Sequence, residues 1–319
     1  MGEKTQQVDQ FRDHADQLLE EERYEEAIEL YLKLLAMNPG DESLLMSLAW
    51  AYNDSGQSDK ALEYFEILFE RELKRSVFTG FAFDELVRIY RSEGKFDRLV
   101  NMCERVVDMQ PGDVALLTTL GDACLKADRL ERAAEIFELL TDMEPDAPVL
   151  FCSLASTYIA AGDYEKAEAA YGRAAEIEPS EAPAVYHRMG FALLEAGQVE
   201  RAEAAVRRSI DLCFEKALHH CTLGDIQIRQ GRLDEAWKSY ERAVTIDPAS
   251  AEGFYNRLGN ALASEGYHHR AIDAFEQALE MDPHNPFYYR SIIESCAAEG
   301  LDEKAREIYE KARSLKVFD

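Results

Sequence analysis

Three residues of the types that commonly bind metals stand together, namely His219, His220 and Cys221. Imidazole nitrogen and thiolate sulfur are the ligands that zinc prefers. Successive residues of a helix point about 100° apart, so three consecutive side chains cannot converge on one ion. We therefore interpret the cluster as ordinary helix packing and expect no metal site.

The common catalytic motifs are missing from the sequence. It contains no GxxxxGK[ST] or GxGxxG phosphate loop, no HExxH helix and no GxSxG elbow. The 62 acidic residues fit solvent-exposed helix faces, which is the usual place for charged side chains. The sequence thus predicts a protein that is not an enzyme, with no catalytic residues and no cofactor.

The charge balance limits the partners. Lys and Arg number 35 against 62 Asp and Glu, so the net charge is −27. Nucleic acid and anionic membrane surfaces both require clustered cations, so neither is expected as a partner. No apolar run is long enough to cross a membrane, and the first 19 residues are polar, so we expect a cytoplasmic protein. The six cysteines are scattered without a CxxC pair, which favours free, mostly buried thiols in a reducing compartment.

Proline and glycine recur with a regular period. Prolines stand 34, 35 or 69 residues apart at 111, 145, 179, 248 and 283. Glycines keep the same spacing at 56, 94, 162, 197, 231, 266 and 300, with Asp128 in the glycine place once. A period of this length indicates an array of repeats.

Residues 148–181 show what one repeat contains. A first apolar stripe at helical spacing consists of Phe151, Leu154, Ala155 and Tyr158. Gly162 then ends the helix, because glycine adopts conformations that bulky residues resist. A second stripe consists of Ala167, Tyr171 and Ala174, and Pro179 closes the unit. Each repeat is therefore predicted to be a pair of helices.

This pattern resembles the tetratricopeptide repeat family over nearly the whole chain. The family pattern has a large apolar residue at position 4, Leu at 7, a small residue at 8, Tyr at 11, Ala at 20, an aromatic at 24, Ala at 27 and Pro at 32. Nine units follow it, at 8–41, 42–75, 80–113, 114–147, 148–181, 183–216, 217–250, 252–285 and 286–319. The resemblance implies an all-α fold, a right-handed superhelical α-solenoid of antiparallel helix pairs.

Two irregularities interrupt the pattern. Residues 76–79 are inserted between the second and third units, either as a break in stacking or as a slightly longer loop. A break would divide one continuous array into 1–75, a polar lead with repeats one and two, and 80–319, repeats three to nine. At the other end, Ile308 and Leu315 follow the last stripe. Either the polar residues of 302–316 cover that end, or it contacts a partner or another copy of the chain, so we expect a monomer or self-association through the C-terminal end.

The resemblance also implies which residues face a concave groove, namely positions 2, 5, 6, 9, 12 and 13 of each repeat. In repeats six to nine these positions gather arginines, an asparagine pair four residues apart and two phenylalanines. The candidate partner-binding residues are His187, Arg188, Phe191, Thr222, Arg229, Asn256, Arg257, Asn260, Phe287 and Arg290. Such a set could bind an extended peptide bearing carboxylates, with arginines as bidentate partners. Alternatively, the arginines pair with acids of neighbouring repeats.

The leading hypothesis is a non-catalytic scaffold that holds a peptide segment or partner protein in its groove. The alternative is an accessory or regulatory subunit of an enzyme or assembly complex, docked through the outer face or the C-terminal end. The family's device for binding C-terminal carboxylates is not reproduced, because His187, Phe191, Thr222, Gly253 and Arg257 occupy its positions in repeats six to eight.

Repeat three, 80–113, is expected to be the least stable helix pair. Val87 and Leu99 stand where small residues would let the helices approach closely. Hydrogen exchange should therefore find its amides less protected than those of 148–181. Equal protection of the two segments would contradict this expectation.

Overall fold

A computed structural model describes residues 2–75 and 80–318, with side chains from residue 10 onward. All regular structure in these residues is helical, and it forms eighteen α-helices and one short 3-10 helix. The chain divides into two compact units, Met1–Ile136 and Phe137–Asp319. The predicted all-α fold is confirmed.

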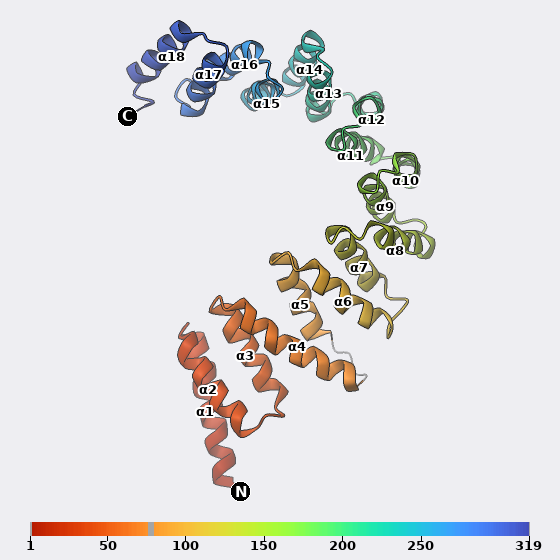
Figure 1. The fold of residues 1–319 in the computed structure, drawn as a ribbon, viewed down its shortest axis with the longest axis vertical. Coiled ribbons are helices and arrows are strands. Elements are labelled where there is room, and N and C mark those ends of the chain that lie inside the picture. Colours follow the sequence, from red (N-terminus) through yellow and green to blue (C-terminus); the bar gives the residue numbers. More distant parts are fainter. Residues whose placement is uncertain (1, 76–79, 319) are drawn as a thin grey trace. The chain divides into compact units, whose positions relative to one another are not determined.

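The first unit contains the helices of the first three predicted repeats and the start of the fourth (Figure 1). These helices are α1 (Gly2–Glu20), α2 (Tyr24–Met37), α3 (Glu42–Asp54), α4 (Ser58–Arg75), α5 (Phe81–Ser92), α6 (Phe96–Val107), α7 (Val114–Lys126) and α8 (Leu130–Met143), whose second half belongs to the second unit.

The second unit contains the remaining five repeats as five helix pairs. They are α9 (Pro148–Ala160) with α10 (Tyr164–Ile177), α11 (Ala182–Glu195) with α12 (Val199–Leu212), α13 (Ala217–Arg229) with α14 (Leu233–Ile246), α15 (Ala251–Ser264) with α16 (His268–Met281), and α17 (Pro286–Ala298) with α18 (Asp302–Ser314). The 3-10 helix η1 (Pro248–Ser250) precedes α15.

Every predicted repeat therefore corresponds to one pair of helices. Each unit is a solenoid in which a pair packs against its neighbours along the chain. Residues 76–79 lie outside the described residues, so the expected break in stacking there stays a prediction, as does the division into 1–75 and 80–319.

The turn inside each pair requires a left-handed backbone. Gly162 has a φ of +79°, and the following Asp163 N–H donates to Tyr158 O at 2.8 Å, which closes the end of α9. Asp128 adopts the same conformation with a φ of +59°. The periodic glycine, and the one aspartate that replaces it, thus mark the turn between two helices, as the sequence indicated.

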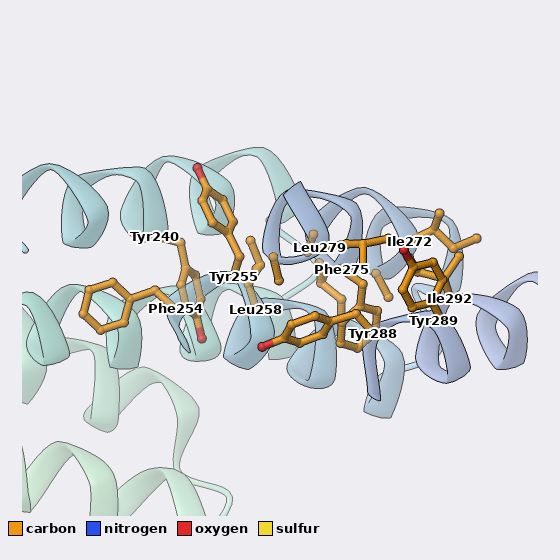
Figure 2. Packing of buried hydrophobic residues seen from close by; sticks show 14 of the residues in the cluster. Tyr240, Phe254, Tyr255, Leu258, Ile272, Phe275, Leu279, Tyr288, Tyr289 and Ile292 are labelled. Atoms are coloured by element: carbon orange, nitrogen blue, oxygen red, sulfur yellow. The ribbon is translucent and has the colours of Figure 1, made fainter. Parts of the chain in front are cut away.

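Close approach of the paired helices depends on small residues facing rings. A Cβ added at Gly259 would lie 2.6 Å from Phe275 Cε1, and one at Gly224 would lie 2.6 Å from the Tyr240 ring. Figure 2 shows the resulting core of the last three repeats, which runs from Tyr240 past Phe275 to Ile292. Since neighbouring pairs share these side chains, the core is continuous across repeats.

Repeat three departs from this pattern. Leu99 is fully buried at the place of the usual small residue. The helices α5 and α6 approach each other along a shorter stretch than α1 and α2 or α3 and α4. Looser packing of this pair, which the sequence predicts from its larger side chains, stays a prediction that hydrogen exchange can test.

The last repeat is partly covered by the residues that follow α18. Val317 N–H donates to Ala312 O at 2.9 Å, and the Phe318 ring packs against Tyr289 and Tyr309 with centroids 6.1 and 5.8 Å away. Ile308 is buried in the core cluster against which Val317 and Phe318 pack. Much of the apolar stripe at this end thus has a cover from the chain itself.

The cysteines carry free thiols, as the sequence predicts. Five of the six are buried, and Cys213 is half-buried. Burial raises the pKa of Cys103 and of Cys221 to about 12, so neither is a nucleophile at neutral pH. Among the described residues, no helix has both the length and the apolar character to span a bilayer.

The glycine–ring contact can be tested at Gly259. We expect Gly259→Ala to destabilise the protein by about 1–3 kcal/mol, because the added methyl group overlaps Phe275. Gly253 lies on the same helix with nothing near its missing Cβ, so Gly253→Ala should be neutral or stabilising by up to about 1 kcal/mol. Urea unfolding of both variants measures the difference. Equal changes in the free energy of unfolding of the two variants would show that the close contact between Gly259 and Phe275 does not affect stability.

Candidate functional site

The first helices of successive pairs lie next to each other in the second unit. α11 contacts α13, and α13 contacts α15. A pocket of about 540 Å³ opens on these three helices. It is lined by five of the predicted residues, Phe191, Arg229, Asn256, Arg257 and Asn260.

An ion pair forms the floor of this pocket. Arg257 donates to Asp225 Oδ2 from Nε at 3.0 Å and from Nη2 at 2.5 Å. The hydroxyl of the buried Tyr240 donates to the other carboxylate oxygen of Asp225. Burial raises the pKa of Asp225 against the opposing effect of Arg257. Arginine keeps its proton in proteins, so Arg257 carries a positive charge that is already paired with Asp225.

Arg229 is also held by its own chain. Its Nη1 donates to Leu194 O at 2.8 Å, and its guanidinium lies 3.7 Å from Glu195 and 3.8 Å from Glu265. The alternative in which arginines pair with acids of neighbouring repeats thus holds for Arg257 and Arg229. With three carboxylates and two guanidinium groups in its lining, the pocket has no excess of positive charge.

The asparagine pair offers free hydrogen-bonding groups. Asn260 Nδ2 donates to Asn256 Oδ1 at 3.0 Å. In the described part of the chain, the Asn256 amide nitrogen and the Asn260 carbonyl oxygen have no further partner. One donor group and one acceptor therefore stand side by side, next to Phe191, which is 49% exposed. This is the complement of a peptide unit beside an apolar side chain.

His187 and Thr222 form an internal contact. His187 Nε2 lies 2.9 Å from Thr222 Oγ1, which also accepts from Arg257 at 3.3 Å. Thr222 is only 1% exposed. Thr222 therefore positions its neighbours and cannot contact a partner directly.

The other three predicted residues lie outside the pocket. Phe287 packs edge-on against Phe275 and Tyr288, with ring centroids 6.3 and 5.7 Å away. Arg290 lies over the Phe318 ring at 5.9 Å. Arg188 is exposed. Burial raises the pKa of the Cys152 thiol, and the guanidinium of Arg188 lowers that pKa by a smaller amount. No acid lies within ion-pair distance of Arg188 or Arg290 in residues 10–75 and 80–318.

Sequence reasoning left Asp225, Glu195 and Glu265 out of the candidate site. A signal for Asp225 existed, because it occupies position 9 of repeat seven and Arg257 occupies position 6 of repeat eight. Both positions face inward in adjacent repeats, so opposite charges there can be expected to pair. Glu195 and Arg229 both occupy position 13, in repeats six and seven, so the same signal existed for that pair, whereas Glu265 falls outside the inward-facing positions.

His219 and His220 are both buried. Burial lowers the pKa of His219 to about 4, with a further contribution from His187. His220 Nε2 bonds to Phe214 O at 3.0 Å. The described residues hold no group of three or more side chains suited to a metal ion.

Comparison with known families agrees with this architecture. The pattern described as "Tetratricopeptide repeat" matches residues 18–76, 90–150 and 158–211, and a second pattern of that description matches 253–285. A "TPR repeat" pattern matches 224–257, and a "PPR repeat" pattern matches 287–317. The chain belongs to the tetratricopeptide repeat family.

Individual relatives are distant. A segment of 65 residues is 34% identical to "Small glutamine-rich tetratricopeptide repeat-containing protein 2" of Mycosarcoma maydis, which is 20% of this chain and 18% of that protein. Among solved structures, MamA is 22% identical with a TM-score of 0.37 over 50% of this chain and 93% of its own. The Cut9-Hcn1 complex of the APC/C is 15% identical with a TM-score of 0.41 over 93% of this chain and 65% of the matched chain.

The histidine cluster predicts how stability depends on pH. The pKa of His219 is about 4 in the folded chain against an ordinary 6.5, so the unfolded chain binds more protons between these values. The contribution of neutral His219 to the free energy of unfolding should therefore be fully present above pH 6.5. It should fall as the pH drops towards 4, by on the order of 1–2 kcal/mol between pH 7 and pH 5.

Thermal unfolding of the wild type and of His219→Asn at several pH values measures this effect. Asparagine retains a donor near the place of Nδ1 and does not titrate, so the variant should lose less stability on acidification. All other titrating groups are shared, and their contributions cancel in the comparison. Parallel pH profiles of the two proteins would contradict the assignment.

Proposed function

We propose that this protein is a non-catalytic interaction scaffold, and that the groove over α11, α13 and α15 holds an extended segment of a partner protein. The observation that carries the proposal is the asparagine pair in the lining of the pocket, which keeps one donor and one acceptor without a partner among the described residues. An extended peptide leaves every second backbone N–H and C=O pointing to one side, so such a pair can bind it independently of its side chains.

Phe191 supplies the apolar part of the same surface. The residue is 49% exposed and lines the same pocket as the asparagines. A large apolar side chain of the partner packed against it would add the favourable burial that hydrogen bonds alone do not provide. The partner segment is therefore extended and carries an apolar residue near its point of contact.

Carboxylates of the partner would bind to arginines that lie outside the pocket. Arg188 and Arg290 are exposed, and neither has an acid within ion-pair distance in the described chain. These two arginines keep the proposed role of binding carboxylates of the partner. Arg257 and Arg229 instead pair with acids of the chain itself.

The asparagine pair can be tested by affinity capture with the full chain as bait. We expect the double variant Asn256→Ala/Asn260→Ala to bind the captured partner about tenfold more weakly, since two net hydrogen bonds are lost. Lys238→Ala, on the exposed face of the second helix α14, is the control and should bind normally. Loss of binding in the control alone would favour the alternative, an accessory subunit docked through its outer face.

The arginines are tested separately with the same partner. Arg188→Ala/Arg290→Ala should weaken binding and reduce its dependence on salt, because exposed charge pairs are screened by ions. The affinity at low and high salt measures both effects. An unchanged salt dependence would remove carboxylates from the proposal while leaving the groove intact.

A further inference from the structure

A second pocket lies at the N-terminal ends of α13 and α15. It has a volume of about 490 Å³, and its lining includes His187, His219, Leu218 and Phe254. His187 is its only residue among the groove candidates described above, and its other lining residues belong to a different surface. Leu218 is 55% exposed at its rim.

The hydrogen bonds of Ser209 determine which nitrogen of His219 is protonated. Ser209 Oγ lies 2.6 Å from Pro183 O and 2.8 Å from His219 Nδ1. A carbonyl oxygen only accepts, and two oxygens this close repel each other without a hydrogen between them, so the serine hydrogen goes to Pro183. His219 Nδ1 must then donate to Ser209, which leaves Nε2 with a lone pair.

No group in the described part of the chain donates to this lone pair. His219 is 7% exposed, and its Nε2 forms no hydrogen bond within the described residues. The side chain lines the pocket, so the unpartnered acceptor is available only to something that enters there. A ligand with a donor group can form a hydrogen bond there that the described chain does not supply.

The charges around the pocket are also unpaired. Glu215 and Asp247 both line it, and neither has an ion-pair partner in residues 10–75 and 80–318. The lining also contains one cation, Lys216, which is the next residue after Glu215. The lining therefore combines acceptors and negative charge with apolar surface from Leu218 and Phe254.

We propose that this pocket binds a basic side chain, an arginine or lysine, of a partner protein. Such a side chain has an apolar stem that packs on Leu218 and Phe254 and a cationic head that donates several hydrogen bonds. The head group satisfies His219 Nε2 and is attracted by Asp247 and Glu215. The site is separate from the asparagine pair and does not depend on peptide binding in the groove.

The test uses the full chain labelled with ¹⁵N at histidine and the probe N-acetyl-argininamide. The imidazole signals of His219, assigned with His219→Asn, should shift and saturate as the probe is added. N-acetyl-citrullinamide, which has nearly the same shape and no charge, should produce little change. Equal shifts with the two probes, or none with the arginine probe, would overturn the proposal.

Asp247→Asn provides the matched variant. Removing this charge should weaken binding of the arginine probe about tenfold, which corresponds to one charge-assisted hydrogen bond. Asp282 ends α16 with the same backbone conformation as Asp247 at the end of α14, so Asp282→Asn should leave the affinity unchanged. An affinity that Asp247→Asn does not alter would also overturn the proposal, whatever the outcome for the groove.

Discussion

The structure depends on how closely the two helices of a repeat approach each other. At Gly259 and Gly224 a single added carbon would overlap the ring on the opposite helix. The small residue lets the ring fill the space between the helices, and the shared side chains then bind each pair to the next. Because most repeats have a small residue at this place, the first helices of the second unit are placed side by side. The pockets arise from this spacing.

Tyrosine connects that core to the surface of the groove. The ring of Tyr240 is fully buried against Gly224, and a buried hydroxyl requires an acceptor. Asp225 supplies it and in turn holds Arg257. Tyr171 reaches Ser156 at 3.2 Å in the same way. The polar residues on the floor of the groove are thus positioned by the core. The arginine there is structural, while the asparagine pair keeps one donor and one acceptor without a further partner in the described chain.

The two pockets differ in what the chain leaves unsatisfied. In the groove, the charges are paired internally and neutral amide groups remain. At the ends of α13 and α15, the carboxylates of Glu215 and Asp247 remain and the ring of His219 lacks a donor. The network from Ser209 through His219, His187 and Thr222 to Arg257 lies between them. Neighbouring surfaces of one unit are therefore suited to different chemical groups.

The sequence by itself determined the nine repeats, the turn at each glycine and the candidate helices of the groove. These features are local, since a glycine at position 8, an alanine at position 20 and a proline at position 32 act within one helix pair. Only the tertiary structure decided which of ten candidate residues meet, and that Arg257 is bound to Asp225 whereas Arg188 and Arg290 have no acid beside them in the described chain. An ion pair between repeats depends on distances of a few ångströms across two backbones, and a repeat pattern does not specify those distances. The direction of the His219 hydrogen bond was decided in the same way, by the position of Pro183 O beside Ser209.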